Sequence, residues 1–304
     1  MGFFKRHSGR ANYDLLSNYS HYLPGFGGMM MMLFLFGIGA LLGILVLIPF
    51  TLIYPESATT YGNIISYPLM FVPPMLYASA QSRRANIFES GYALDSNHFG
   101  QRGGFWMAVI VAVATLAAAF VAEPLSAWLP PMQEALEQAM NAMLDGPVWV
   151  SFLSVSVFAP FFEEWLCRGI VLRGLLQKSS PTVAIVVSAA FFAILHMNPW
   201  QAIPAFLLGL LFGYVYYKTG SLKLTMLMHF VNNTFALMIS KVPSLADAEN
   251  FMDVLCPWKY TCIYIASVLF LVSAVVILAA IPKKEGANAT VTRFNRWIYK
   301  HQGL

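Results

Sequence analysis

The sequence has 304 residues, of which 58% are hydrophobic and only 11% are charged. Together with a mean hydropathy of +0.64, this composition excludes an ordinary soluble globular protein and predicts an integral membrane protein. The net charge of +4 gives no reason to expect a nucleic-acid partner, because the basic residues fall in links between apolar segments.

The apolar segments follow one another along the chain, and a membrane-spanning helix needs about 20 mostly apolar residues. The first segment, 29–54, contains no polar residue before Thr51. It is too long for a secretory signal and has no convincing cleavage site, so we expect it to be a retained anchor. Further spans are expected at 61–81, 104–122, 148–176, 181–198, 200–217, 222–240 and 260–281. The predicted fold is therefore all-α, a polytopic membrane helix bundle with about eight transmembrane helices.

Lysine and arginine are concentrated in alternate connections between these segments. They are Lys5, Arg6, Arg10, Arg83, Arg84, Arg102, Arg173, Lys178, Lys218, Lys223, Lys283, Lys284, Arg293, Arg296 and Lys300. By contrast, the connection 54–60 has Glu56 and no basic residue. Because cytoplasmic loops are enriched in Lys and Arg, we expect both termini to be cytoplasmic. The expected location is an integral, multi-pass position in a prokaryotic cell (inner) membrane.

We expect one integral domain, because no internal repeat is visible. The division is a cytoplasmic N-terminal tail, 1–28, an integral membrane helical domain, 29–282, and a basic cytoplasmic C-terminal tail, 283–304. An amphipathic helix within 131–144 is expected to lie on the outer interface. Two of the three cysteines, Cys256 and Cys262, could form a disulfide at the outer end of the last span.

Ionisable residues inside a predicted span are costly, and they indicate a functional site unless a partner explains them. Segment 148–176 contains Glu163, Glu164 and Arg168. Arg168 follows Glu164 by four residues, so the two can form an ion pair on one helix face. Glu163 points about 100° away from Glu164, and its neighbours Phe161 and Phe162 cannot satisfy it.

Other polar residues come from two later spans. His196 ends segment 181–198, with Phe192 one helical turn earlier. His229 and Asn233 stand four residues apart in segment 222–240, and so lie on one helix side. A single intramembrane His or Asn is often only a hydrogen bond between helices. The combination of a carboxylate, two imidazoles and an amide from three helices predicts one shared site.

This set of side chains is suited to hydrolysis of a peptide bond. A carboxylate can act as general base towards a water molecule, which an imidazole can hold in place. A second imidazole and an amide N–H group can stabilise the oxyanion. No serine or cysteine nucleophile, His-Glu-x-x-His motif or Gly-x-Gly-Asp motif accompanies them. Zinc remains an alternative, with Glu163, His196 and His229 as ligands; otherwise we expect no cofactor.

The three motifs resemble a known family. The patterns are EExxxR (Glu163, Glu164, Arg168), FxxxH (Phe192, His196) and HxxxN (His229, Asn233). In this order they are similar to those of the CPBP family, the CAAX proteases and bacteriocin-processing enzymes, also called the Abi family. The resemblance covers about residues 148–240, which we therefore expect to be the protease core.

The resemblance implies a role for each matching residue. Glu163 would act as the base on water and His196 would help to position that water. His229 and Asn233 would form the oxyanion hole, while Glu164 and Arg168 would brace the site. The implied activity is an intramembrane endopeptidase, a hydrolase of glutamate type, with the zinc type as the less favoured alternative.

The expected partners are the lipid bilayer and a membrane-tethered peptide or protein substrate, of prenylated or bacteriocin-like type. A different class of function stays open, namely a noncatalytic immunity or chaperone-like factor, or a transporter, on the same scaffold. Transporters often contain repeated halves with broken helices, whereas the polar residues here cluster in the second half of the chain.

Overall fold

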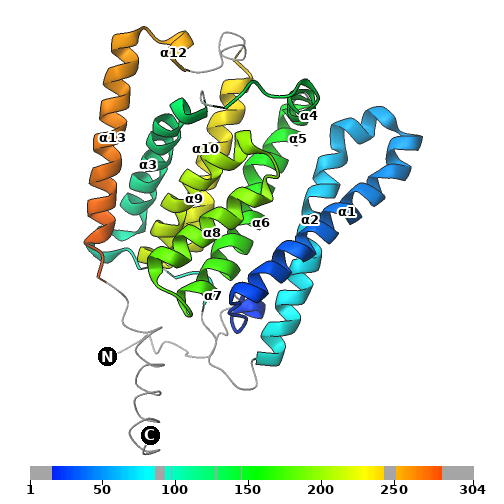
Figure 1. The fold of residues 1–304 in the computed structure, drawn as a ribbon, viewed down its shortest axis with the longest axis horizontal. Coiled ribbons are helices and arrows are strands. Elements are labelled where there is room, and N and C mark those ends of the chain that lie inside the picture. Colours follow the sequence, from blue (N-terminus) through cyan, green and yellow to red (C-terminus); the bar gives the residue numbers. More distant parts are fainter. Residues whose placement is uncertain are drawn as a thin grey trace, which may run out of the picture.

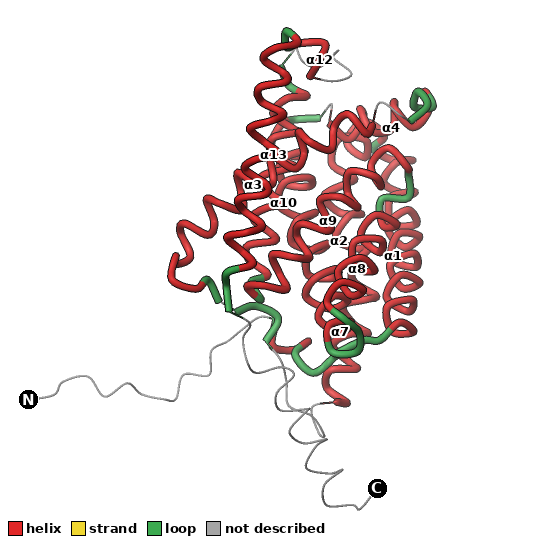
Figure 2. Tube along the Cα trace, turned by 60° about the vertical axis from the view of Figure 1, so that its left-hand side comes forward, coloured by secondary structure: helices red, strands yellow, loops and turns green. Residues whose placement is uncertain are grey.

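The computed structural model describes residues 16–85, 93–96, 98–126, 129–144, 146–242 and 251–282. In these ranges every regular element is a helix (Figures 1 and 2). The separate α-helices are α1 (Phe26–Ile53), α2 (Pro55–Ala85), α3 (Gly103–Ser126), α4 (Glu134–Leu144), α8 (Pro181–Leu195), α9 (Pro199–Thr219), α10 (Leu222–Ser240), α12 (Phe251–Val254) and α13 (Pro257–Ala279). Short 3₁₀ turns are η1 (Ser17–Tyr19) and η2 (Gly100–Arg102). The all-α helix bundle expected from the sequence is confirmed.

One further long helix runs through several consecutive elements. These are α5 (Val148–Ser151), η3 (Phe152–Phe158), α6 (Ala159–Glu164), η4 (Trp165–Leu172) and α7 (Arg173–Leu176). We call Val148–Leu176 the central helix. Its η3 and η4 parts are π-helical, a wider form that is rare and occurs frequently at functional sites.

A helix stands at each of the eight predicted positions, but the helices are not equally apolar. The described helices that are long and apolar enough to cross a membrane by themselves are α1, residues Gly103–Leu125 of α3, the central helix, α9 and α13. The α8 helix is apolar but has only 15 residues, while α2 contains three internal prolines, Pro68, Pro73 and Pro74. These findings establish a multi-pass integral membrane protein.

The helices form three groups across the bundle, as Figure 1 shows. The α1 and α2 pair stands at one side, α3 and α13 pack together at the other, and the central helix lies between them with α8, α9 and α10. The α1 and α2 backbones approach closely at Gly39, where an added Cβ would lie 2.2 Å from the carbonyl oxygen of Met70. Only glycine permits this contact.

The turns that join α8, α9 and α10 are fixed by local sequence signals. The side chains of Asn198 and Ser221 accept hydrogen bonds from the backbone N–H groups of Gln201 and Leu224, which caps α9 and α10. Gly220 ends α9 with a φ of 63°, the left-handed conformation that glycine adopts without strain. These turns set how far each helix extends past its neighbours, and so they fix the depth of the residues that line the site.

The residues before α1 pack onto the end of the central helix. The buried Arg173 guanidinium donates to the backbone carbonyls of Tyr19, Ser20 and Tyr22. An added Cβ at Gly174 would lie 2.3 Å from the carbonyl oxygen of Pro24. Most of the predicted N-terminal tail and the whole C-terminal tail, 283–304, lie outside the described residues.

The predicted amphipathic helix is present as α4, with Glu134 and Glu137 exposed. It lies near the start of α9, because the indole N–H of Trp200 donates to the carbonyl of Pro130. Cys256 and Cys262 are both exposed and free rather than bridged.

Candidate active site

The two adjacent glutamates lie on α6, the short α-helical part of the central helix between its two π-helical stretches. Pro160, in the first turn of α6, has no backbone N–H to donate. The wider turns of η3 and η4 change the angular spacing of side chains on either side of α6. The ordinary 3.6-residue period therefore gives only an approximate direction for residues before and after the glutamates.

Glu164 and Arg168 form a fully buried ion pair. The distance between Oε1 of Glu164 and a guanidinium nitrogen of Arg168 is 2.7 Å, and both side chains are 0% exposed. The guanidinium also donates to the backbone carbonyl of Gly209 on α9, at 3.1 Å. Its carbon lies 4.5 Å from the centre of the Phe192 ring on α8, a cation–π distance. Arg168 therefore holds the central helix, α8 and α9 together.

Glu163 differs from Glu164 in both exposure and partners. Its side chain is 13% exposed, and its Oε1 accepts a hydrogen bond from the hydroxyl of Tyr67 on α2. Its other oxygen, Oε2, has no hydrogen-bond partner within the described ranges. A buried carboxylate oxygen without a partner is rare because it loses its hydration without compensation. This oxygen is therefore available to a bound molecule.

His229 lies between the two glutamates. Its Nδ1 is 3.2 Å from Oε1 of Glu164, and its Nε2 is 3.9 Å from Oε2 of Glu163. An ionised carboxylate only accepts hydrogen bonds, so Nδ1 of His229 carries a proton. That contact fixes the ring orientation and turns Nε2 towards Glu163.

His196 is the C-cap residue of α8. Its Nδ1 is 3.0 Å from the backbone carbonyl of Phe192, and a carbonyl is an acceptor, so Nδ1 is the donor. In the neutral imidazole, Nε2 is then the acceptor. The ring of Phe192 makes edge contacts with His196 and His229, with centroids 5.0 and 5.4 Å apart respectively. Phe192 therefore packs against both imidazoles.

Asn233 lies one turn beyond His229 on α10, and its amide is already partly engaged. The amide nitrogen donates to the backbone carbonyl of Val155 in η3, at 2.9 Å. Its oxygen accepts a hydrogen bond from Asn232, at 3.1 Å. An amide nitrogen has two N–H groups, so one remains for another acceptor. Asn232 was not expected to take part, because i and i+1 residues point in different directions on a helix.

These residues meet at a cavity of about 380 Å³, which we call the catalytic cavity. Among its lining residues are Glu163, Phe192, His196, His229, Asn232 and Asn233. The Glu164 and Arg168 pair lies behind this lining. The structure thus brings together, from the central helix, α8 and α10, all the residues that the three motifs single out.

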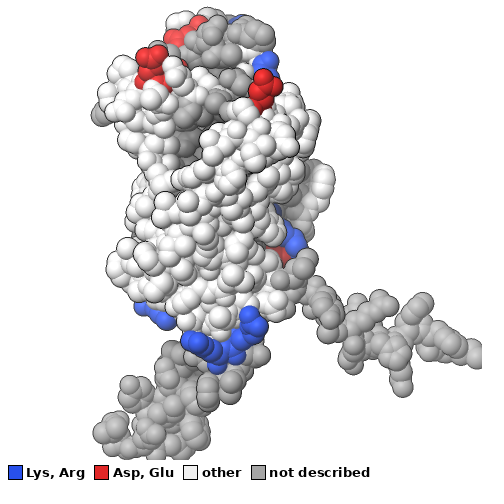
Figure 3. All heavy atoms as spheres, turned by 90° about the vertical axis from the view of Figure 1, so that its right-hand side faces the viewer, with Lys and Arg blue, Asp and Glu red and all other residues white. Residues whose placement is uncertain are grey.

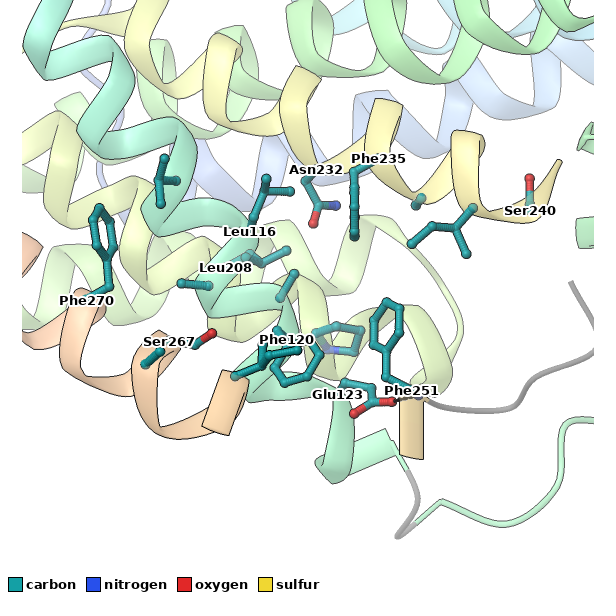
Figure 4. Close-up of a pocket in the computed structure, with 18 residues that line it drawn as sticks. Leu116, Phe120, Glu123, Leu208, Asn232, Phe235, Ser240, Phe251, Ser267 and Phe270 are labelled. Carbon is teal, nitrogen blue, oxygen red and sulfur yellow. Dashed lines mark hydrogen bonds between the residues drawn. The ribbon is translucent and has the colours of Figure 1, made fainter. Parts of the chain in front are cut away.

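A second and larger cavity adjoins the first. Its volume is about 850 Å³, and we call it the apolar cavity. Figure 4 shows its lining of phenylalanine and aliphatic side chains from α3, α9, α10, α12 and α13. The two cavities share the wall residues Pro204, Leu208, Asn232 and Ala236. An apolar chain attached to a molecule in the catalytic cavity would thus find a matching surface next to it.

The zinc alternative named Glu163, His196 and His229 as ligands. No group of three or more His, Cys, Asp or Glu side chains in the described ranges is placed to hold a metal ion. Oε1 of Glu163 accepts from Tyr67, and Nδ1 of His229 is directed to Glu164. Because no such group is present in the described ranges, we derive no step through a metal.

Comparison with known proteins gives one match. Residues 145–235 match the model of the family described as type II CAAX prenyl endopeptidase Rce1-like. The match confirms the resemblance to the CPBP family, and it spans the central helix, α8, α9 and most of α10. No curated protein and no solved structure gives a significant match to the chain.

Proposed function

Since residues 145–235 form an Rce1-like segment, we propose that the protein is an intramembrane endopeptidase. It hydrolyses a peptide bond of a membrane-associated substrate, of prenylated or bacteriocin-like type, in a prokaryotic cell membrane. The observation that carries the proposal is Oε2 of Glu163. It has no hydrogen-bond partner among the described residues, lies 3.9 Å from Nε2 of His229 and faces a cavity that two imidazoles also line.

The proposed nucleophile is a water molecule held by Glu163 and His196. Among the described residues, no group donates to Oε2 of the Glu163 carboxylate. In neutral His196, Nδ1 is the donor and Nε2 is an acceptor, so these two atoms can each accept one proton of the same water. Glu163 removes the proton as the water oxygen attacks the peptide carbonyl carbon. When the tetrahedral intermediate collapses, the C–N bond breaks and the proton passes from Glu163 to the leaving amine.

The carbonyl oxygen gains negative charge during the attack and needs donors. His229 can supply one from Nε2 only as an imidazolium, because its Nδ1 proton is already directed to Glu164. The charges in the site then balance, with Glu163 and Glu164 negative and Arg168 and His229 positive. The free N–H of Asn233 supplies a second donor from the same face of α10.

Glu164 and Arg168 support this arrangement without touching the substrate. They are 0% exposed and lie behind the cavity lining. Glu164 orients His229, and Arg168 holds Glu164 and ties the central helix to α9. Their proposed role is therefore to position the other side chains.

A peptide library tests the function. Purified protein in detergent would be incubated with membrane-tethered, prenylated and unmodified peptides, and products identified by mass spectrometry. The same assay would be run on the His196→Ala variant, which changes a half-buried residue at a helix end. We expect wild type to cleave a membrane-tethered class and the variant to lose most of that activity. Binding of peptides without cleavage by either protein would instead support the noncatalytic scaffold.

A further inference from the structure

The two ends of the helix bundle carry opposite charge. One end, which we call the basic face, contains Arg83, Arg84, Lys178, Lys218 and Lys223, with the buried Arg173 beneath it and Asp95 as the acidic residue among its described positions. The opposite end, the α4 face, contains Glu56, Glu123, Glu134, Glu137 and Asp253, with Lys241 and Lys259. Figure 3 shows most of the visible Lys and Arg towards the lower end of the molecule, and most of the visible Asp and Glu towards the upper end together with some Lys or Arg. The surface between the two ends is mostly uncharged.

Contacts show that the elements of the basic face lie together. The backbone of His21, in the segment before α1, donates to Ser82 near the end of α2. The backbone of Ser96 donates to Gly220 in the turn between α9 and α10, and His98 contacts the carbonyl of Pro282 after α13. Because Lys and Arg mark the cytoplasmic side, the basic face is the cytoplasmic one.

The catalytic cavity is closed towards this basic face. On that side it ends at Phe212, which is 1% exposed, with Met228 and Arg168 packed behind at 0%. Hydrophobic packing and the buried ion pair thus separate Glu163 from the cytoplasmic side. A substrate approaching from there would have to displace this layer.

The cavity extends in the other direction, to the α4 face. Its lining there includes Met140 of α4 and Trp200 and Gln201 in the first turn of α9. These three side chains are only partly buried. Trp200 is also hydrogen-bonded to Pro130, in the connection that leads into α4. The rim of the cavity is therefore built from elements of the acidic end of the bundle.

The apolar cavity lies in the same half of the bundle. Its lining on α3 falls within 113–123, and on α13 within 263–270. Residues 113–123 are in the half of α3 that ends at the α4 face, and 263–270 are in the half of α13 that begins there. The apolar surface beside the catalytic cavity is thus at the depth of the leaflet away from the basic face.

From these placements we propose that the catalytic cavity opens on the non-cytoplasmic side of the membrane. If the protein has the proposed function, its substrate is a peptide segment presented on that side, with its membrane anchor in the non-cytoplasmic leaflet. A peptide attached to the cytoplasmic leaflet would meet the closed basic face instead.

Cysteine labelling tests the side on which the cavity opens. In a Cys256→Ser/Cys262→Ser background, the remaining Cys167 is buried. Gln201→Cys places a thiol at the cavity rim, and Met140→Cys does so from α4 if the first variant fails to fold. Right-side-out and inside-out membrane vesicles would be treated with a membrane-impermeant maleimide.

Two markers define the faces in the same assay. Lys178→Cys, in the same background, marks the basic face, and native Cys256 in a Cys262→Ser variant marks the α4 face. In right-side-out vesicles we expect the maleimide to label the rim thiol, as it labels Cys256. In inside-out vesicles we expect neither thiol to be labelled. Labelling together with Lys178→Cys, or from neither side, would overturn the proposal. Labelling needs no substrate, so the side on which the cavity opens is decided separately from peptidase activity.

Discussion

The hydroxyl of Tyr67 on α2 donates a hydrogen bond to Oε1 of Glu163 on α6, across 96 residues of sequence. The other oxygen of Glu163, Oε2, has no hydrogen-bond partner in the described part of the chain. Tyr67 does not appear among the residues that line the catalytic cavity. We therefore expect Tyr67 to act on Glu163 from outside the cavity lining, by fixing which of the two carboxylate oxygens faces a bound water.

Tyr67→Phe should lower kcat while leaving KM nearly unchanged. A hydrogen bond to a charged group contributes about 1.5–3 kcal/mol, and if this energy orients Glu163 in the transition state, kcat falls about 10- to 100-fold. Steady-state kinetics on a cleaved peptide checks the split between kcat and KM. Tyr77→Phe is the matched control, because Tyr77 is on the same helix and contacts Tyr22 instead. Equal effects of the two changes would remove Tyr67 from the positioning role.

Arg168→Met should destabilise the folded protein as well as slow the reaction. The change leaves Glu164 charged, 0% exposed and without its ion-pair partner. Removing one member of a buried pair costs about 3–5 kcal/mol, which thermal unfolding in detergent would detect as a lower Tm. The double variant Glu164→Gln/Arg168→Met should recover much of that stability, since no buried charge is left unpaired. An Arg168→Met protein with the Tm of wild type contradicts the bracing role.

Chelators should not affect cleavage. The proposed mechanism uses Glu163 as the base without a metal, and the described residues contain no three-ligand metal cluster. Activity after prolonged treatment with 1,10-phenanthroline is therefore expected to match that of untreated enzyme. The metal content of the purified protein would be measured in parallel. Activity that is lost with the chelator and restored by added zinc would reinstate the zinc mechanism.

The helical architecture was accessible from the sequence because long apolar runs and basic links determine where a chain crosses a membrane. The Glu164 and Arg168 pair was equally accessible, since residues four apart share a helix face. The spacing of His229 and Asn233 placed both on one side of α10 for the same reason, and both line the cavity.

Other features depend on tertiary packing or on irregular helix geometry. Tyr67 lies in a span outside the three motifs, and its only sequence signal is a hydroxyl within an apolar segment. The two π-helical stretches around α6 have no periodic signature, although Pro160 marks one place where an α-helical hydrogen bond is lost. Asn232 reaches both cavities because the larger one lies on its side of α10. That side is defined by α3 and α13, far away in the sequence.

The most direct test of the mechanism is the cleavage rate of Glu163→Gln. Glutamine keeps the size of the side chain and a hydrogen-bond acceptor for Tyr67, but it cannot take a proton from water. Loss of a general base lowers rates by about 10²–10⁴-fold, and we predict a fall in kcat of that order with an unchanged Tm. Glu134→Gln, at an exposed position on α4, should retain full activity. A folded Glu163→Gln protein that cleaves at the wild-type rate would contradict the account.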